Sequence, residues 1–485
     1  MSAALPAPTN PLVPARPPRK LSVALVQRLL DHLLDRSTEG GFVAWFFAFC
    51  ADDVRYIVEY KTWAMWDGRR WMIDGADAIR ERAKESVQAI LDMLPREPNK
   101  EKQKAILRLF QRYDNVDRIK KMLDYARTDP RVVTSMHDYD CDPWLLNCAN
   151  GTVDLRTGHL LVPQRADMIT KILEIPYAQQ ADAPAWRAFL QRIMQGHPEM
   201  IPFLQRAVGY SLTGSTREQC FFVLHGTGRN AKSTFVETLL SMLGEYGQTS
   251  NPESWLKQSG GRNAEPDIAR LPGVRMVTSA ELGEGRAIDE ARIKQITGVD
   301  RIATRNLYER EFEFLPACKL WISTNHEPTI KGTDDGMWRR VRLVPFAETI
   351  SYEEMDREMP AKLREDLPGI LAWAVQGCLA WQDGGLAMPE IVRATTAEYR
   401  TEQDIVGQFV DACCVREKEA REAGSVLYAS YAEWARVRGE RPFNATLFGR
   451  RLGALRFTRE KIGGTVWRNG LRVRPPGPEG LQPSA

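Results

Sequence analysis

Residues 221–235 combine glycines, a lysine and a hydroxyl group in the manner of a phosphate-binding loop; they read FFVLHGTGRNAKSTF. The usual pattern is G-x-x-x-x-G-K-S/T, and Ala231 replaces its second glycine. The lysine of such a loop neutralises the β- and γ-phosphates of a nucleotide, and the serine hydroxyl ligates Mg²⁺. The sequence therefore predicts a site for ATP and Mg²⁺. Its residues are Gly226, Thr227, Gly228, Arg229, Asn230, Ala231, Lys232, Ser233 and Thr234, with Ser233 as a metal ligand.

The alanine at position 231 does not exclude a working loop. Glycine is required only where φ is positive or where a Cβ atom would strike the ligand. Ala231 lies just before the lysine, at the expected start of a helix, and Gly226 and Gly228 remain to let the backbone turn. We therefore expect Ala231 to have a negative φ and to direct its methyl group away from the phosphates.

Three other segments carry side chains that an ATPase needs. The strand-like VRMVTSA run ends at Glu281, with Glu284 three residues later, and these acids can hold Mg²⁺ and polarise water. The CKLWIST run ends at Asn325, which can sense a γ-phosphate. Arg339 and Arg340 precede another apolar run, and either could be an arginine finger offered to a neighbouring subunit. Taken singly, each segment is also compatible with an ordinary loop or turn.

The elements that must position these residues follow from hydrophobic patterning. FFVL, VRMVTSA and CKLWIST alternate with helical segments, as expected of an α/β core, and STFVETLLSMLG predicts a helix directly after the loop. A strand, a glycine-containing loop and a helix together turn backbone N–H groups toward a phosphate. The expected domains are a disordered Pro-rich tail (1–20), a mostly helical domain with small hairpins (21–185), the α/β core (186–350), a helical bundle segment (351–400) and a winged helix (401–485).

The C-terminal segment combines basic charge with a DNA-binding pattern. A helix, a turn, a second helix capped by Asn444 and a hairpin at a Gly-Gly turn follow one another, which is the order in a winged helix. Between Arg436 and Arg474 there are eleven Lys or Arg residues and two acids. A solvated basic face is the alternative, but charge and pattern together favour DNA, with Arg450 and Arg451 as candidate contacts.

Composition excludes several other classes of protein. At 485 residues the chain is too long for one core, and its net charge of +3 indicates no nucleic-acid partner by itself. The eight Cys form no C-x-x-C pair and the six His are scattered, which argues against zinc knuckles and disulfides. No apolar run approaches the roughly 20 residues of a membrane helix. We expect a cytoplasmic protein without a membrane partner.

The order of the motifs resembles that of the superfamily 3 helicases. GTGRNAKST, SAELGEG, IKQITGVDRIATR, LWISTNHEP and WRRVRLVPF succeed one another as in the helicase part of phage and plasmid primase–helicases. Upstream, LLNCANGTVDLRTG and LQRAVGYSLTG look like the helical domain that precedes the ATPase in that family. The resemblance covers residues from about 45 to 385.

The resemblance implies an AAA+-like ATPase core in a hexameric ring that translocates on DNA and unwinds it. It assigns the phosphates to Lys232, the metal and water to Glu281, and sensing to Asn325. It also places a hairpin between residues 300 and 318 in the channel of the ring. Arg305, Tyr308 and Arg310 lie near the tip of that hairpin, where they suit DNA phosphates and base faces.

The resemblance also bears on partners and on alternative functions. Relatives often carry a primase domain, for which the 185 N-terminal residues are too few, so a separate primase or polymerase is an expected partner. An origin-binding initiator or loader without unwinding activity is the main alternative, and a small-molecule kinase is another. A phage- or plasmid-encoded chain would act in the bacterial cytoplasm.

Overall fold

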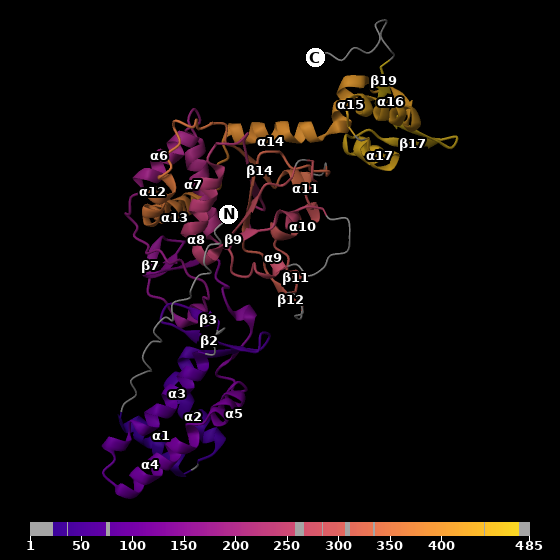
Figure 1. The fold of residues 1–485 in the computed structure, drawn as a ribbon. Coiled ribbons are helices and arrows are strands. Elements are labelled where there is room, and N and C mark those ends of the chain that lie inside the picture. Colours follow the sequence, from indigo (N-terminus) through magenta and orange to yellow (C-terminus); the bar gives the residue numbers. More distant parts are fainter. Residues whose placement is uncertain are drawn as a thin grey trace, which may run out of the picture. The chain divides into compact units, whose positions relative to one another are not determined.

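The computed structural model describes residues 23–35, 37–73, 78–257, 266–283, 285–305, 311–332, 335–440 and 442–474 (Figure 1). The chain divides into two compact units. The first comprises Met1–Ala181 and Gly244–Tyr246, and the second comprises Asp182–Leu243 and Gly247–Ala485. The Pro-rich tail predicted for 1–20 lies outside the described residues. Within the described part, none of the helices is both long and apolar enough to cross a membrane.

The first unit is mostly helical, with an aromatic core that includes Phe42 and Trp45. Within the domain expected to be mostly helical, residues 23–50 and 100–126 each contain two helices rather than one. The side chains of Thr38 and Asn115 accept backbone N–H groups and so start a new helix within each region. The helices are α1 (Val23–Asp35), α2 (Glu39–Cys50), α3 (Ala78–Leu91), α4 (Lys100–Tyr113) and α5 (Val116–Ala126).

Two small sheets complete the first unit. One of the small hairpins expected in this domain turns at Asp67-Gly68, where Trp66 pairs with Trp71 and Asp67 accepts the N–H groups of Arg69 and Arg70. One sheet has the order β3-β2-β1-β4 and the other β5-β6-β7. The strands are β1 (Val54–Ile57), β2 (Thr62–Trp66), β3 (Trp71–Ile73), β4 (Val133–Thr134), β5 (Leu145–Cys148), β6 (Gly151–Asp154) and β7 (His159–Leu161).

The second unit contains a parallel sheet of five strands in the order β14-β8-β13-β10-β9. Its strands are β8 (Phe221–His225), β9 (Gly247–Ser250), β10 (Met276–Ala280), β13 (Lys319–Thr324) and β14 (Val341–Pro345). The three predicted apolar runs and the apolar run after Arg340 all form strands. The β9 segment, GQTS, was not predicted, since it has no apolar pattern. The predicted hairpin is present as β11 (Ile302–Thr304) and β12 (Phe312–Phe314).

Helices pack around this sheet and continue beyond it. They are α6 (Pro184–Ile193), α7 (Met200–Leu212), α8 (Lys232–Leu243), α9 (Pro266–Ala269), α10 (Glu290–Ile296), α11 (Asp335–Trp338), α12 (Met359–Glu365), α13 (Leu367–Gly384) and α14 (Glu390–Gln403). The helices expected after residue 350 are therefore present. The helix α8 starts at Lys232, directly after the loop of interest, as its sequence predicts.

The C-terminal segment contains the predicted succession of helix, helix and hairpin. The side chain of Asn444 accepts the N–H of Leu447, as a cap should. Three short strands in this segment, β15, β16 and β19, were not predicted. The elements are α15 (Ile405–Cys413), β15 (Cys414–Val415), β16 (Arg421–Ala423), α16 (Gly424–Val437), α17 (Ala445–Ala454), β17 (Arg459–Ile462), β18 (Thr465–Asn469) and β19 (Arg472–Val473).

Glycines allow α7 and α13 to approach closely; the two helices lie side by side in Figure 1. A Cβ atom on Gly209 would lie 2.1 Å from the backbone nitrogen of Cys378, and one on Gly377 would lie 2.0 Å from the carbonyl oxygen of Gln205. Neither distance is possible for a real side chain. The crossing of these helices therefore depends on both glycines.

We predict that Gly377→Ala lowers the free energy of unfolding by about 1–3 kcal/mol, because the helices must separate to admit the methyl group. Gly384→Ala in the same helix is the matched control, since no atom lies within 4 Å of its added Cβ. The control should change stability by less than about 0.5 kcal/mol. Urea denaturation measures both, and equal losses would contradict the argument.

Candidate functional site

The parallel register brings the ends of three strands to one edge of the sheet. Thr324 of β13 lies opposite His225 of β8, and Ala280 of β10 lies opposite Ser323 of β13. The residues that follow these strands must therefore emerge beside one another. They are the loop after β8, Glu281 after β10 and Asn325 after β13.

The ammonium group of Lys232 is the centre of this edge. Its Nζ donates hydrogen bonds to the carbonyl oxygen of Gly226 (2.8 Å), Oδ1 of Asn230 (2.8 Å) and Oδ1 of Asn325 (3.1 Å). Nδ2 of Asn325 lies 3.5 Å from Oε1 of Glu281. Burial lowers the pKa of Lys232, and the charge of Glu281 opposes this shift. All three acceptors are neutral, so they hold the ammonium in place without cancelling its charge.

The loop before α8 bends through several left-handed residues. Gly228 has φ +107°, Arg229 +50° and Ala231 +58°. The expectation of a negative φ for Ala231 was therefore wrong. Ala231 precedes the first residue of α8 and belongs to the turn between β8 and α8, where Gly228 and Arg229 also have positive φ. An alanine in this conformation costs about 1–2 kcal/mol.

Gly226 is required because of close packing rather than φ. A Cβ atom there would lie 2.1 Å from Nδ2 of Asn230 and 2.4 Å from the carbonyl oxygen of Phe346. The same Asn230 Nδ2 donates a 3.0 Å hydrogen bond to Phe346. Asn230 thus links the loop to the chain after β14 while its Oδ1 holds Lys232.

A cleft of about 840 Å³ opens over the loop, which is within the size range of ligand sites. The loop from Gly228 to Thr234, together with Glu281 and Asn325, forms its polar part. An apolar part, which the sequence did not indicate, contains Phe189, Ile350, Met355 and Met359. Charged residues also line this part, among them Arg192 and Asp356, so the cleft offers apolar contacts beside a polar loop.

The two arginines considered for a finger have different environments. Arg339 is exposed, and its Nη2 donates to Oε1 of Gln219 (3.0 Å). Arg340 is only 8% exposed, and its Nε donates to Oγ1 of Thr297 (3.0 Å). Neither lines the cleft of this chain. Arg339 is the one that a second molecule could reach.

The remaining predicted site residues differ in their exposure and in whether the structure describes them. Arg305 is exposed at the end of β11, whereas Glu284, Tyr308 and Arg310 lie outside the described residues. In α17, Arg450 is exposed, but Arg451 is buried and unavailable on the outer face of the helix.

Glu327 has an environment that sequence reasoning missed. Burial and the neighbouring carboxylates of Glu402 and Glu398 raise its pKa to about 7. Nδ1 of His225, whose pKa burial lowers, lies 3.8 Å from Oε1 of Glu327. The only signal in the sequence was the position of Glu327 two residues after Asn325, and α14 contributes the other two acids from a distant segment.

Two family matches and several viral relatives agree with the motif order. Residues 41–195 match the family described as "D5 N terminal like", and residues 224–340 match a family of unknown function, DUF5906. A candidate helicase of Acanthamoeba polyphaga mimivirus is 28% identical over 340 residues, which are 65% of this chain and 35% of that protein. These matches support a relationship to the phage-type primase–helicase family.

Other relatives extend the comparison. A candidate helicase of Frog virus 3 is 28% identical over 48% of this chain and 26% of its own length. A candidate primase of African swine fever virus is 22% identical over 66% of this chain and 35% of its own length. The chain thus spans about a third of such relatives. The solved C-terminal region of NrS-1 aligns over 86% of this chain and 95% of that one, with a TM-score of 0.47 and 11% identity.

We predict that Ala231→Gly raises the free energy of unfolding by up to about 1 kcal/mol, because relief of the left-handed strain outweighs the added chain entropy of glycine. Gly228→Ala should lower it, since φ there is +107° although nothing lies within 4 Å of the added Cβ. Urea denaturation of both variants checks the signs. A loss of stability in Ala231→Gly would contradict a left-handed Ala231.

We also predict a pH dependence that Glu327 causes. Because its pKa rises from 4.5 to about 7 on folding, the folded protein keeps a proton that the unfolded chain releases. Stability therefore falls as pH rises between these values, by about 1–2 kcal/mol after allowance for solvent screening. Glu327→Gln should abolish this part of the difference in unfolding free energy between pH 5 and pH 8. The exposed Glu390→Gln should leave it unchanged, and equal slopes in both variants would reject the assignment.

Proposed function

We propose that this chain is an ATP-driven DNA helicase of superfamily 3 whose second unit is an AAA+-like P-loop ATPase. The observation that carries the proposal is the convergence of Lys232, Asn325 and Glu281 at one edge of a parallel sheet, beside a left-handed turn that leads into the start of α8. The names of the viral relatives support a role in DNA replication.

Each residue at this edge has a role in the proposed reaction. Lys232 and the loop N–H groups hold the β- and γ-phosphates, while Asn325 contacts the γ-phosphate and orients water. Glu281 accepts a hydrogen bond from that water and draws its proton toward the carboxylate. The Ser233 hydroxyl and Glu281 are hard oxygen donors, and Mg²⁺ usually takes one or two such protein ligands together with phosphates and water. When bound, Mg²⁺ would screen the phosphate charge.

Arg339 is the arginine finger that we propose each chain offers to the ATP site of a neighbouring subunit. It is exposed, and among the described residues its side chain donates a hydrogen bond to Gln219 at the surface. The bonds of Arg340 to Thr297 and Gly336 instead fix that side chain inside its own chain. Arg340 then has a supporting role, holding the segment from which Arg339 projects. A finger supplied in trans requires a ring, and we propose a homohexamer.

DNA would be contacted by two parts of the chain. The β11–β12 hairpin carries Arg305 toward its tip, and Arg450 is exposed on α17 of the C-terminal module, which we propose to be a winged helix. A separate primase or polymerase would supply primers. A phage- or plasmid-encoded chain would work in the cytoplasm of the bacterial host.

An origin-binding initiator or loader is the second candidate, because the basic C-terminal helices and hairpin would suffice for binding without unwinding. A forked-duplex assay separates the two functions. We expect the purified chain to separate strands when ATP and Mg²⁺ are present, and not with a non-hydrolysable analogue. Binding of the fork with ATP turnover but without strand separation would favour the loader.

We predict that Lys232→Met and Arg339→Ala each lower DNA-stimulated ATP turnover by about 10³-fold or more. Mixing the two inactive variants should restore activity, because random assembly completes roughly a quarter of the interfaces of a ring. Turnover in the mixture measures this directly. The exposed Arg393→Ala should retain full activity. A mixture as inactive as its components would reject a finger acting in trans.

A further inference from the structure

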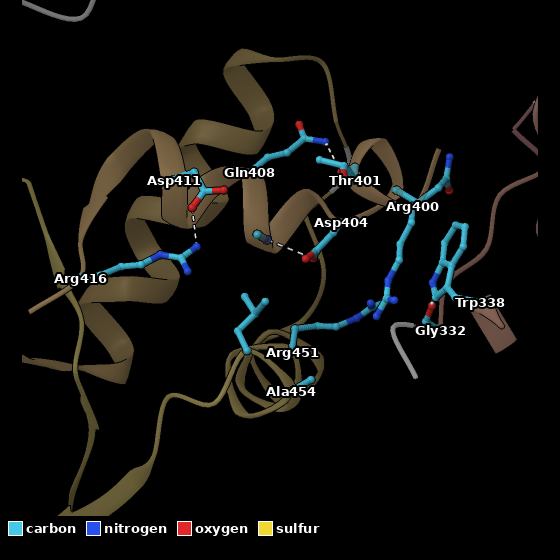
Figure 2. Close-up of a pocket in the computed structure, with 13 residues that line it drawn as sticks. Gly332, Trp338, Arg400, Thr401, Asp404, Gln408, Asp411, Arg416, Arg451 and Ala454 are labelled. Atoms are coloured by element: carbon cyan, nitrogen blue, oxygen red, sulfur yellow. Dashed lines mark hydrogen bonds and ion pairs between the residues drawn. The ribbon is translucent and has the colours of Figure 1, made fainter. Parts of the chain in front are cut away.

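A second cavity, of about 280 Å³, lies within the second unit where α14, the start of α15 and α17 meet (Figure 2). Three arginines line it: Arg400, Arg416 and Arg451. It shares no lining residue with the cleft over the loop. Whatever it binds is therefore separate from the proposed ATP site.

Arg451 is the unusual member of this set. Arg451 is 5% exposed, and its Nη2 is buried without a hydrogen-bond partner among the described residues. The side chain points into the cavity, toward that of Arg400 (Figure 2). Arg400 and Arg416 pair with Asp335 and Asp411, respectively. The described part of the chain provides no ion pair for Arg451, whose guanidinium carbon lies 5.4 Å from the ring centre of Phe443.

The nearest carboxylates already have other partners. Asp404 and Glu290 attract the charge of Arg451 electrostatically, but Oδ1 of Asp404 accepts the N–H of Gly407 at 3.0 Å, and Oε1 of Glu290 accepts the N–H of Gly332. Burial accordingly lowers the pKa of Arg451 despite both carboxylates. A buried guanidinium with an unused N–H group is costly unless an anion joins it.

The start of α15 adds to the attraction for an anion. Asp404 caps this helix of 9 residues, and Gly407 and Gln408 of its first turn line the cavity. The positive end of the helix dipole therefore faces the same space as the three guanidinium groups. Planar guanidinium groups bind phosphate oxygens in a bidentate geometry, as they also bind carboxylates.

We propose that this cavity is a phosphate-binding site in which Arg451 is the central donor. Its volume of about 280 Å³ is below the range usual for whole ligands, so it accommodates one phosphate group rather than an entire nucleotide. That group is either a phosphate of a DNA backbone or a free phosphate ion. The proposal goes beyond the helicase function, and it holds whether or not the loop before α8 hydrolyses ATP.

The test uses the full chain with Lys232→Met as its background, which removes the lysine of the loop. Thermal melting is compared in inorganic phosphate and in chloride of equal ionic strength, and the affinity for phosphate is measured by calorimetry. Arg451→Met is the test variant. Arg436→Met, an exposed arginine on α16, is the control.

We expect the order of the melting temperatures of Arg451→Met and its parent to reverse between chloride and phosphate. In chloride, Arg451→Met should melt at or above its parent, because it replaces an unpaired buried charge with an apolar side chain of similar length. In phosphate the parent and Arg436→Met should rise above it, and Arg451→Met should bind phosphate at least about tenfold more weakly. If Arg451→Met melts below its parent in chloride and all three respond equally to phosphate, Arg451 is a packing residue and the proposal fails. Absence of saturable phosphate binding in the parent would also overturn it.

A single-stranded oligothymidylate then identifies the source of the phosphate. If Arg451→Met weakens oligonucleotide binding and the oligonucleotide competes with phosphate in the parent, the site holds a DNA backbone phosphate. If Arg451→Met loses phosphate binding but binds the oligonucleotide as its parent does, the ligand is a free phosphate ion. Loss of ATP turnover in this background is expected and bears on neither result.

Discussion

The bonds of one ammonium group organise the candidate site. Lys232 joins the end of β8 through Gly226, the loop through Asn230 and the end of β13 through Asn325. Each of these acceptors is neutral, so the lysine retains a positive charge in a place where burial already destabilises it. Folding has already positioned and desolvated this charge. A phosphate that binds here would therefore interact with it without a further cost for ordering the lysine. The loop, the strand order and the helix start all serve to keep these three acceptors within reach.

The sheet can provide this arrangement because contacts of Trp321 fix its central strands against each other and against α7 and α8. Trp321 of β13 stacks on Phe222 of β8 with ring centres 4.2 Å apart, and its Nε1 donates to Oγ of Ser211 on α7 (3.1 Å). Phe235 of α8 packs near the same tryptophan. A slip of one residue between β8 and β13 would break these contacts and would also move Asn325 away from Lys232. The aromatic core and the polar edge therefore depend on the same register.

The sequence was informative where one physical effect dominates. Buried parallel strands are continuous apolar runs, so β8, β10 and β13 could be predicted, and the ends of such strands locate Glu281 and Asn325. The short β9 has no such run, and tertiary pairing alone makes it a strand. The side chains of Thr38 and Asn115 cap new helices, and hydrophobic periodicity alone does not reveal these boundaries. The φ of Ala231 was mispredicted because the turn, rather than the preference of alanine, decides the backbone conformation there.

Pairs of adjacent arginines show most clearly that the sequence does not reveal which side chain is exposed and which is buried. Arg339 and Arg340 look equivalent in the sequence, as do Arg450 and Arg451, yet one of each pair is exposed and the other buried. Consecutive side chains on a helix or turn point in different directions, so a pair of basic residues at the edge of a core must divide between solvent and interior. Arg340 donates to Thr297 from its interior position, whereas Arg451 lies over the ring of Phe443 and its Nη2 has no hydrogen-bond partner among the described residues. The same local pattern thus yields a structural arginine in one place and an unpaired charge, suited to an anion, in the other.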